Sequence, residues 1–200
     1  MTTLKLVDAA QHVRATYANA NAHQIIHSYN KDGVQACILK GGLLVIPGTN
    51  EKRDWWRFNF NVLRGFSGSL WHDGFYNHAR TVFNWAKPLK PRFIVGHSLG
   101  AASAQIVGMS LGVPTIAFAS PRPLKGRLVS TQGRWIININ RRDDRVCGLP
   151  PLAAGFNHVG RADWIGPLRF NFGEDHRMGN YIGLLKQERV KRRLPPHWPF

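Results

Sequence analysis

The chain has 200 residues, an apolar fraction of 44%, and 27 Lys and Arg against 11 Asp and Glu, which gives a formal net charge of +16. This length and composition predict one folded domain over residues 1–200 and exclude an intrinsically disordered chain. No apolar run reaches the roughly 20 residues of a membrane span, and the N-terminal region lacks the basic start and apolar run of a secretory signal. We therefore expect a cytoplasmic protein, or one released by a route that needs no signal peptide.

The first half of the chain is predicted to begin with a helix within residues 1–20 and to continue with short strands. NKDG separates two apolar runs, as is typical of a β-hairpin. The predicted elements are a helix over 4–20, strands over 23–29, 34–40 and 43–48, and a helix over 73–86. The intervening segment has no clean period and holds many aromatic residues, namely Trp55, Trp56, Phe58, Phe60, Phe66 and Trp71.

The second half of the chain alternates strands with helices. The predicted elements are a strand over 93–96, a helix over 99–111, strands over 114–120 and 134–140, a short hairpin within 162–172 and a helix over 176–192. This alternation predicts an α/β fold with a mostly parallel central sheet and helices on both faces.

The excess of positive charge indicates an anionic partner, which could be an anionic membrane surface, a nucleic acid or an acidic substrate. Its densest stretch is KQERVKRR, inside a basic and Pro-rich C-terminal segment, 186–200. A solvated helix end gives the same pattern, so this stretch does not identify the partner. The two cysteines, Cys37 and Cys147, have only their even number to suggest a disulfide, and no Cys/His spacing indicates a metal site.

One short stretch, RFIVGHSLGAASA at 92–104, has the pattern of a nucleophilic serine. A G-x-S-x-G turn between a strand and a helix exposes the serine hydroxyl, and the flanking glycines remove Cβ atoms that would clash with neighbouring elements. Ser98 is therefore the candidate nucleophile, and the amide of Leu99 is a candidate donor to an oxyanion. The competing interpretation is a structural serine at the start of a helix.

A serine nucleophile needs a base and an acid, which follow it along the chain in the order Ser, Asp or Glu, His in this type of fold. Asp143 and Asp144 come directly after a predicted strand, where the acid is expected, and the other acids fit surface charges better. His158 and His176 are both candidates for the base. His197 lies in the Pro-rich segment and fits least well.

Several motifs occur together in a specific order, from residue 43 to residue 183. They are VIPGT, DWW, WHDGF, VGHSLGAASA, IAFASPRPLKG, DDRVCGLPP, GFNHVGRADWI and DHRMGNYIG. This series resembles the class 3 lipase family, the fungal triacylglycerol lipase type. The resemblance implies an α/β-hydrolase fold and hydrolysis of lipid acyl esters without a cofactor.

The resemblance also assigns roles to individual residues. Ser98 matches the family's nucleophile, Asp144 its acid and His176 its base, with Asp143 as the alternative acid. Thr49 matches a residue whose amide and hydroxyl help to form the oxyanion hole, and Leu99 supplies the second amide. His72 and His158 match structural positions, and His97 has local packing as its simplest role.

The segment 50–71 corresponds to the place of the family's lid. Trp55, Trp56 and Phe58 are the candidate lid residues that would meet a lipid surface, although these aromatics could equally cover the core. Two departures from the family pattern are Pro47, where the family usually has Arg before the Gly-Thr pair, and Arg145, where it usually has Pro.

Together these features predict a serine-dependent lipase or esterase whose substrate is a lipid or another acyl ester. The positive charge suggests a narrower hypothesis, a phospholipase that acts at anionic membranes. A separate hypothesis is an esterase for soluble acyl esters or carbohydrate esters. The alternative from a different class is a polyanion- or nucleic-acid-binding protein built on an inactive hydrolase fold. The oligomeric state is not indicated by the sequence.

Overall fold

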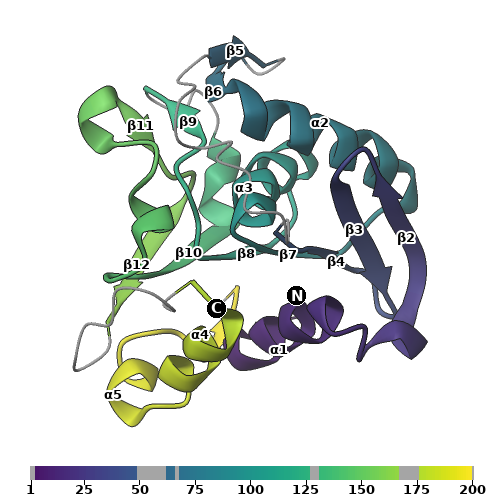
Figure 1. Ribbon diagram of the computed structural model, residues 1–200, viewed down its shortest axis with the longest axis vertical. Coiled ribbons are helices and arrows are strands. Elements are labelled where there is room, and N and C mark those ends of the chain that lie inside the picture. The colour runs from purple at the N-terminus through teal and green to yellow at the C-terminus, as the bar shows by residue number, and fades with distance from the viewer. Residues whose placement is uncertain (1–2, 49–61, 66–67, 127–130, 167–175, 200) are drawn as a thin grey trace.

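The computed structural model describes residues 3–48, 62–65, 68–126, 131–166 and 176–199. Its centre is a seven-stranded sheet, seen nearly edge-on in Figure 1. In spatial order the strands are β12 (Arg161–Ile165), β10 (Ile136–Arg141), β8 (Thr115–Phe118), β7 (Phe93–His97), β4 (Leu43–Ile46), β3 (Val34–Leu39) and β2 (Ile25–Lys31). Neighbouring strands are parallel from β12 to β4, and β3 and β2 follow as an antiparallel hairpin.

Helices cover both faces of this sheet, which confirms the predicted α/β architecture (Figure 1). They are α1 (Leu6–Tyr17), α2 (Asp73–Ala86), α3 (Leu99–Leu111), α4 (Met178–Leu185) and α5 (Glu188–Lys191). α2 and α3 lie on one face, and α1, α4 and α5 on the other. Strand residues alternate between the faces: Leu44 and Ile94 pack with α2 and α3, whereas Val45 and Val95 pack with α1 and α4. These strands read as continuous apolar runs because both faces are buried.

The hairpin between β2 and β3 closes over a two-residue turn, as the sequence predicts. Asp32 and Gly33 have φ values of 53° and 77°, and Lys31 pairs with Val34 across the turn. Turns with positive φ at both central residues match the twist of the flanking strands.

The C-terminal segment differs from the single helix predicted over 176–192. Gln187 has extended backbone, so α4 ends at Leu185 and α5 begins at Glu188. In one continuous helix Val190 would lie about 140° around the axis from Leu185. The break instead lets both residues pack in the same core cluster, together with Leu194 and Leu6.

Two further segments also differ from, or extend beyond, their predicted bounds. Of the hairpin predicted within 162–172, the described part forms the strand β12, which pairs in parallel with β10, and residues 167–172 lie outside the described residues. The N-terminal helix predicted over 4–20 spans Leu6–Tyr17. It begins at Leu6 because the preceding residues form β1 (Leu4–Lys5), which pairs with β13 (His197–Trp198). The two ends of the chain therefore meet.

A second, four-stranded antiparallel sheet was not predicted. It consists of β11 (Phe156–Asn157), β9 (Leu124–Lys125), β6 (Leu70–His72) and β5 (Val62–Arg64). β5 and the first two residues of β6 belong to the candidate lid segment 50–71. There Trp71 is buried in the core, whereas Val62 and Leu63 are exposed. Trp55, Trp56 and Phe58 lie outside the described residues.

Candidate active site

Ser98 sits at a sharp turn between the last residue of β7 and the first residue of α3. Its φ of 59° and ψ of −126° lie in a region that side-chain-bearing residues rarely adopt. Both flanking glycines are required by close contacts. A Cβ atom on Gly96 would lie 2.3 Å from the Gly100 carbonyl oxygen, and one on Gly100 would lie 2.0 Å from the Ile46 carbonyl oxygen. The strained turn predicted from the sequence is therefore present.

Two polar side chains from distant parts of the sequence form a line with Ser98. His176 Nε2 lies 2.7 Å from Ser98 Oγ, and His176 Nδ1 lies 2.9 Å from Asp144 Oδ2. His176 comes just before α4, and Asp144 follows β10. The His176 side chain is 37% exposed and that of Asp144 only 2%. The structure thus brings together the three residues predicted as nucleophile, base and acid.

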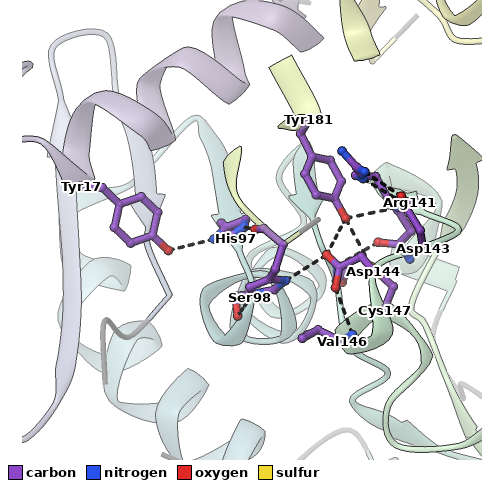
Figure 2. Close-up of polar contacts among 12 residues, drawn as sticks. Tyr17, His97, Ser98, Arg141, Asp143, Asp144, Val146, Cys147 and Tyr181 are labelled. Atoms are coloured by element: carbon purple, nitrogen blue, oxygen red, sulfur yellow. Dashed lines mark hydrogen bonds and ion pairs between the residues drawn. The ribbon is translucent and has the colours of Figure 1, made fainter. Parts of the chain in front are cut away.

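Asp144 accepts hydrogen bonds at both carboxylate oxygens. Tyr181 Oη donates to Oδ2 at 2.9 Å, alongside His176, and the Val146 amide donates to Oδ1 at 3.0 Å. Figure 2 shows Tyr181 reaching toward Asp144, with Val146 below it. Burial acts to raise the pKa of Asp144, but the contacts with His176, Tyr181 and Val146 outweigh it and hold the pKa below its ordinary value. This carboxylate is therefore ionised at neutral pH.

The alternative acid and the alternative base lie elsewhere. Asp143 forms a buried ion pair with Arg141, whose Nη2 is 2.7 Å from Asp143 Oδ2. His158 donates from Nε2 to the Ser120 carbonyl oxygen at 2.7 Å, and burial lowers its pKa to about 4. Neither contact involves Ser98, so the geometry favours Asp144 and His176 over Asp143 and His158.

The region for an oxyanion hole is only partly described. Ser98 is the N-cap of α3, and the first backbone amides of a helix have no acceptor within that helix. The Leu99 amide is one of these. Thr49, the other predicted donor, lies outside the described residues. The residue before it, Gly48, donates its amide to Tyr17 Oη at 2.6 Å.

Three residues near Ser98 were missed or undervalued at the level of sequence. Tyr17, from α1, bonds Gly48 and lies 2.8 Å from His97 Nδ1. Tyr181, from α4, bonds Asp144. His97 bonds the backbone of His176, so its role exceeds packing. In the sequence each appears only as an aromatic residue on an amphipathic or apolar segment, which normally indicates a core position.

Other ionisable groups in the described part of the chain give no sign of a metal centre, since no group of three or more His, Cys, Asp or Glu residues is placed to hold an ion there. Cys37 and Cys147 are both buried free thiols, so the structure does not contain a disulfide between them. None of the described helices combines the length and the apolar character needed to cross a bilayer.

A mostly parallel sheet with a serine on a strained strand-to-helix turn, followed in the chain by an acid and a histidine, defines the α/β-hydrolase fold. Comparison with solved structures agrees. Lipase II from Rhizopus niveus is 19% identical with a TM-score of 0.64, and the match covers 82% of this chain and 83% of that one. For the mono- and diacylglycerol lipase from Aspergillus oryzae the identity is 20%, the TM-score 0.59 and the coverage 83% and 74%.

A triacylglycerol lipase from Penicillium expansum is 16% identical with a TM-score of 0.58, over 80% of this chain and 78% of that one. No known family profile and no curated protein matches the sequence. The likeness to fungal lipases is thus one of fold, at an identity too low to transfer an activity.

Proposed function

We propose that this protein is a serine-dependent carboxylic ester hydrolase that acts on lipid acyl esters. The observation that carries the proposal is the hydrogen-bonded line Ser98–His176–Asp144 beside a strained serine backbone. A serine hydroxyl becomes a useful nucleophile when a base accepts its proton and a carboxylate orients that base. The structural likeness to fungal lipases supports an acyl ester as the substrate class.

In the first step His176 Nε2 takes the proton from Ser98 Oγ while Oγ bonds to the ester carbonyl carbon. His176 Nδ1–H donates to Asp144, whose negative charge stabilises the imidazolium that forms. The tetrahedral intermediate then collapses, the bond to the alcohol oxygen breaks, and the alcohol leaves with the proton from His176. An acyl group remains bound to Ser98.

In the second step water releases the acyl group. His176 takes a proton from the water as its oxygen attacks the acyl carbon, and the proton then returns to Ser98 as the carboxylic acid leaves. The Leu99 amide, with Thr49 as the second proposed donor, would stabilise the oxyanion in both steps. Such donors are typically worth about 3 kcal/mol each.

The charge of the protein favours an anionic lipid surface, and therefore phospholipids, as the narrower substrate class. Several exposed basic residues cluster on and beside α5, namely Lys186, Arg189, Lys191, Arg192 and Arg193. Each basic residue near an anionic bilayer contributes about 1 kcal/mol to binding. We propose in addition that Trp55, Trp56 and Phe58 form a lid that meets this surface.

A series of p-nitrophenyl esters of increasing acyl length, tested with wild type, Ser98→Ala and Ser110→Ala, examines the proposed activity. Ser110 is an exposed serine on the same helix and serves as the matched control. Ser98→Ala is expected to lower kcat by at least about 10³-fold, whereas Ser110→Ala should behave like wild type. Absence of hydrolysis by wild type would reject the enzyme in favour of a polyanion-binding protein on an inactive fold, and full activity in Ser98→Ala would reject Ser98 as the nucleophile.

Vesicles distinguish the phospholipid hypothesis from a soluble ester. Hydrolysis is expected to be faster on anionic than on zwitterionic vesicles, and the difference should shrink as salt screens the charges. Replacing Arg192 and Arg193 by Gln should reduce the preference without changing the rate on a short soluble ester. Equal rates on both vesicle types, insensitive to salt, would leave the soluble ester as the substrate.

A further inference from the structure

A series of hydrogen bonds connects α1, the segment that follows β4, the serine turn and the backbone of His176. The Gly48 amide donates to Tyr17 Oη at 2.6 Å, Tyr17 Oη lies 2.8 Å from His97 Nδ1, and His97 Nε2 lies 2.9 Å from the His176 carbonyl oxygen. Figure 2 shows Tyr17 extending toward His97, directly beside Ser98. The proposed two-step reaction gives neither Tyr17 nor His97 a task.

The direction of each hydrogen bond in this chain follows from its two ends. The His176 carbonyl can only accept, so His97 Nε2 must carry a proton. In a neutral imidazole the other nitrogen, Nδ1, is then an acceptor and receives the proton of the Tyr17 hydroxyl. The Gly48 amide can only donate, and it fills an acceptor site on the same hydroxyl oxygen. Every group is satisfied by one tautomer of His97.

His97 stays in this neutral state because of its surroundings. Burial, and next the neighbouring His176, lower its pKa to about 3, despite the opposing effects of the His176 carbonyl and the charge of Asp144. The other ionisable groups packed on the ring are the hydroxyls of Tyr17 and Tyr181. A second imidazolium beside His176 is therefore avoided when His176 gains a proton during the reaction.

The backbone at Gly48, two residues after the end of β4, is held very close to Ser98. A Cβ atom on Gly48 would lie 2.8 Å from Ser98 Cβ and 2.9 Å from Tyr17 Oη. A small shift of this backbone would therefore change its position relative to Ser98 directly.

We propose that Tyr17 and His97 are positioning residues, which hold the Gly48 backbone on one side and the His176 backbone on the other at fixed distances from Ser98. This inference rests on the proposed function, since the groups that it positions are those of the ester hydrolase. It assigns to the N-terminal helix a role in the reaction besides covering the sheet.

Tyr17→Phe removes one hydroxyl and leaves the ring in place. We expect kcat on a p-nitrophenyl ester to fall about 10-fold with KM within about 2-fold, because an unsatisfied buried amide and imidazole nitrogen let the Gly48 and His97 backbones relax. Tyr29→Phe is the matched control, since Tyr29 is a half-buried tyrosine on β2 outside the hydrogen-bond chain, and it should stay within about 2-fold of wild type in kcat.

Two replacements of His97 separate its hydrogen bond with Tyr17 from its hydrogen bond with the His176 carbonyl. His97→Asn retains an acceptor near the Nδ1 position but no donor for the His176 carbonyl, and His97→Gln retains the donor but not the acceptor. Combining each with Tyr17→Phe gives a double-mutant cycle. The added effect of Tyr17→Phe should be smaller in His97→Gln than in His97→Asn. Equal added effects in both backgrounds would overturn the proposed chain.

Nitrogen-15 NMR of the histidine side chains tests the same arrangement without relying on activity. At pH 7 and at pH 5, His97 is expected to be neutral with its proton on Nε2, and Tyr17→Phe should shift its Nδ1 resonance. If wild type hydrolyses no ester but shows this tautomer, the proposed function fails while the hydrogen-bonded arrangement is supported. A charged or Nδ1-protonated His97 at pH 7, or a Tyr17→Phe variant as active as Tyr29→Phe, would overturn the positioning role.

Discussion

The polar groups on the two sides of Ser98 are organised differently. On the acid side, Tyr181 and His176 both direct a proton at the same oxygen of a buried carboxylate, Asp144. On the oxyanion side, Tyr17 and His97 form a line of neutral groups in which each has one donor and one acceptor contact. In the first arrangement two donors bind one negatively charged oxygen. In the second, a series of neutral hydrogen bonds links the Gly48 backbone to the His176 backbone.

This difference follows from what each side has to hold. A buried carboxylate is costly unless several donors satisfy it, and hydrogen bonds to a charged group are roughly twice as strong as neutral ones. A backbone amide and a carbonyl need only one partner each, so a neutral chain suffices to fix them. Changes on the acid side should therefore affect the reaction more than changes on the oxyanion side.

The largest effect is expected from Asp144→Asn. The Asn amide can present an N–H toward His176 Nδ1, which favours the tautomer whose Nε2 proton faces Ser98. In addition, the negative charge that stabilises the His176 imidazolium is lost. We expect kcat to fall about 10⁴-fold. Asp163→Asn, at a partly exposed carboxylate paired with Arg161, is the control and should retain wild-type kcat. An Asp144→Asn variant with more than a tenth of wild-type kcat would place the acid elsewhere.

Lowering the pH should destabilise the folded protein already at pH values above those at which Asp144 itself gains a proton. Burial lowers the pKa of His78 and His158 to about 4 and that of His97 to about 3, against 6.5 for an unperturbed histidine. The unfolded chain therefore binds protons more readily, and stability that is fully present above pH 6.5 is lost as the pH falls toward 4. Between pH 7 and pH 5 the loss is about 2 kcal/mol per histidine.

Urea unfolding at pH 7, 6 and 5 measures this loss. His158→Gln should remove up to about a third of the pH dependence, because one of the three histidines whose pKa is lowered to about 3 or 4 no longer titrates. A free energy of unfolding that is constant over this range would mean that these imidazoles are not held neutral. In that case the neutral character of the oxyanion side would be contradicted.

Gly100→Ala disturbs the turn that both sides share. The new methyl group would lie 2.0 Å from the Ile46 carbonyl oxygen, so α3 must move away from β4. We expect a loss of about 3 kcal/mol in the free energy of unfolding. Gly183→Ala is the matched control, because this glycine is also helical and has open space around it, and it should raise stability by about 0.5–1 kcal/mol. Equal effects would show that the close approach is dispensable.

Tyr181→Phe is the mildest change on the acid side and tests the contribution of one of the two donors to Asp144 Oδ2. It removes one of the two donors to Oδ2 and also leaves the Arg141 amide without its hydroxyl acceptor. We expect kcat to fall about 30-fold, which is more than for Tyr17→Phe because the lost bond is to a charged group. If Tyr17→Phe instead causes the larger loss, the contrast between the two sides is wrong.

Much of the fold could be predicted from local sequence. Apolar runs bounded by Gly, Pro and Asp marked the strands, and NKDG marked the hairpin, because these signals depend on residues adjacent in the chain. The break at Gln187 could not be predicted, since it follows from Val190 and Leu194 packing on α1. The second sheet was missed for a similar reason, because its strands are two or three residues long and pair across the chain.

The candidate site shows the same division. The turn at Ser98 is a local motif, whereas position after a strand does not separate Asp143 from Asp144. Only the family resemblance favoured Asp144 before the structure showed Arg141 paired with Asp143. Likewise, Tyr17 and Tyr181 acquire a role only from their contacts with Gly48 and Asp144, which lie 31 and 37 residues away in the chain. Thr49, Trp55, Trp56 and Phe58 remain predictions, because they lie outside the described residues.

Covalent labelling with a fluorophosphonate, followed by peptide mass spectrometry, tests the central proposal most directly, because this reagent reacts with an activated serine hydroxyl. The account predicts one label per chain, located on Ser98, absent in Ser98→Ala and much slower to form in His176→Ala. Failure of wild type to react, or a label on a serine other than Ser98, would contradict the assignment of Ser98 as a nucleophile activated by His176 and Asp144.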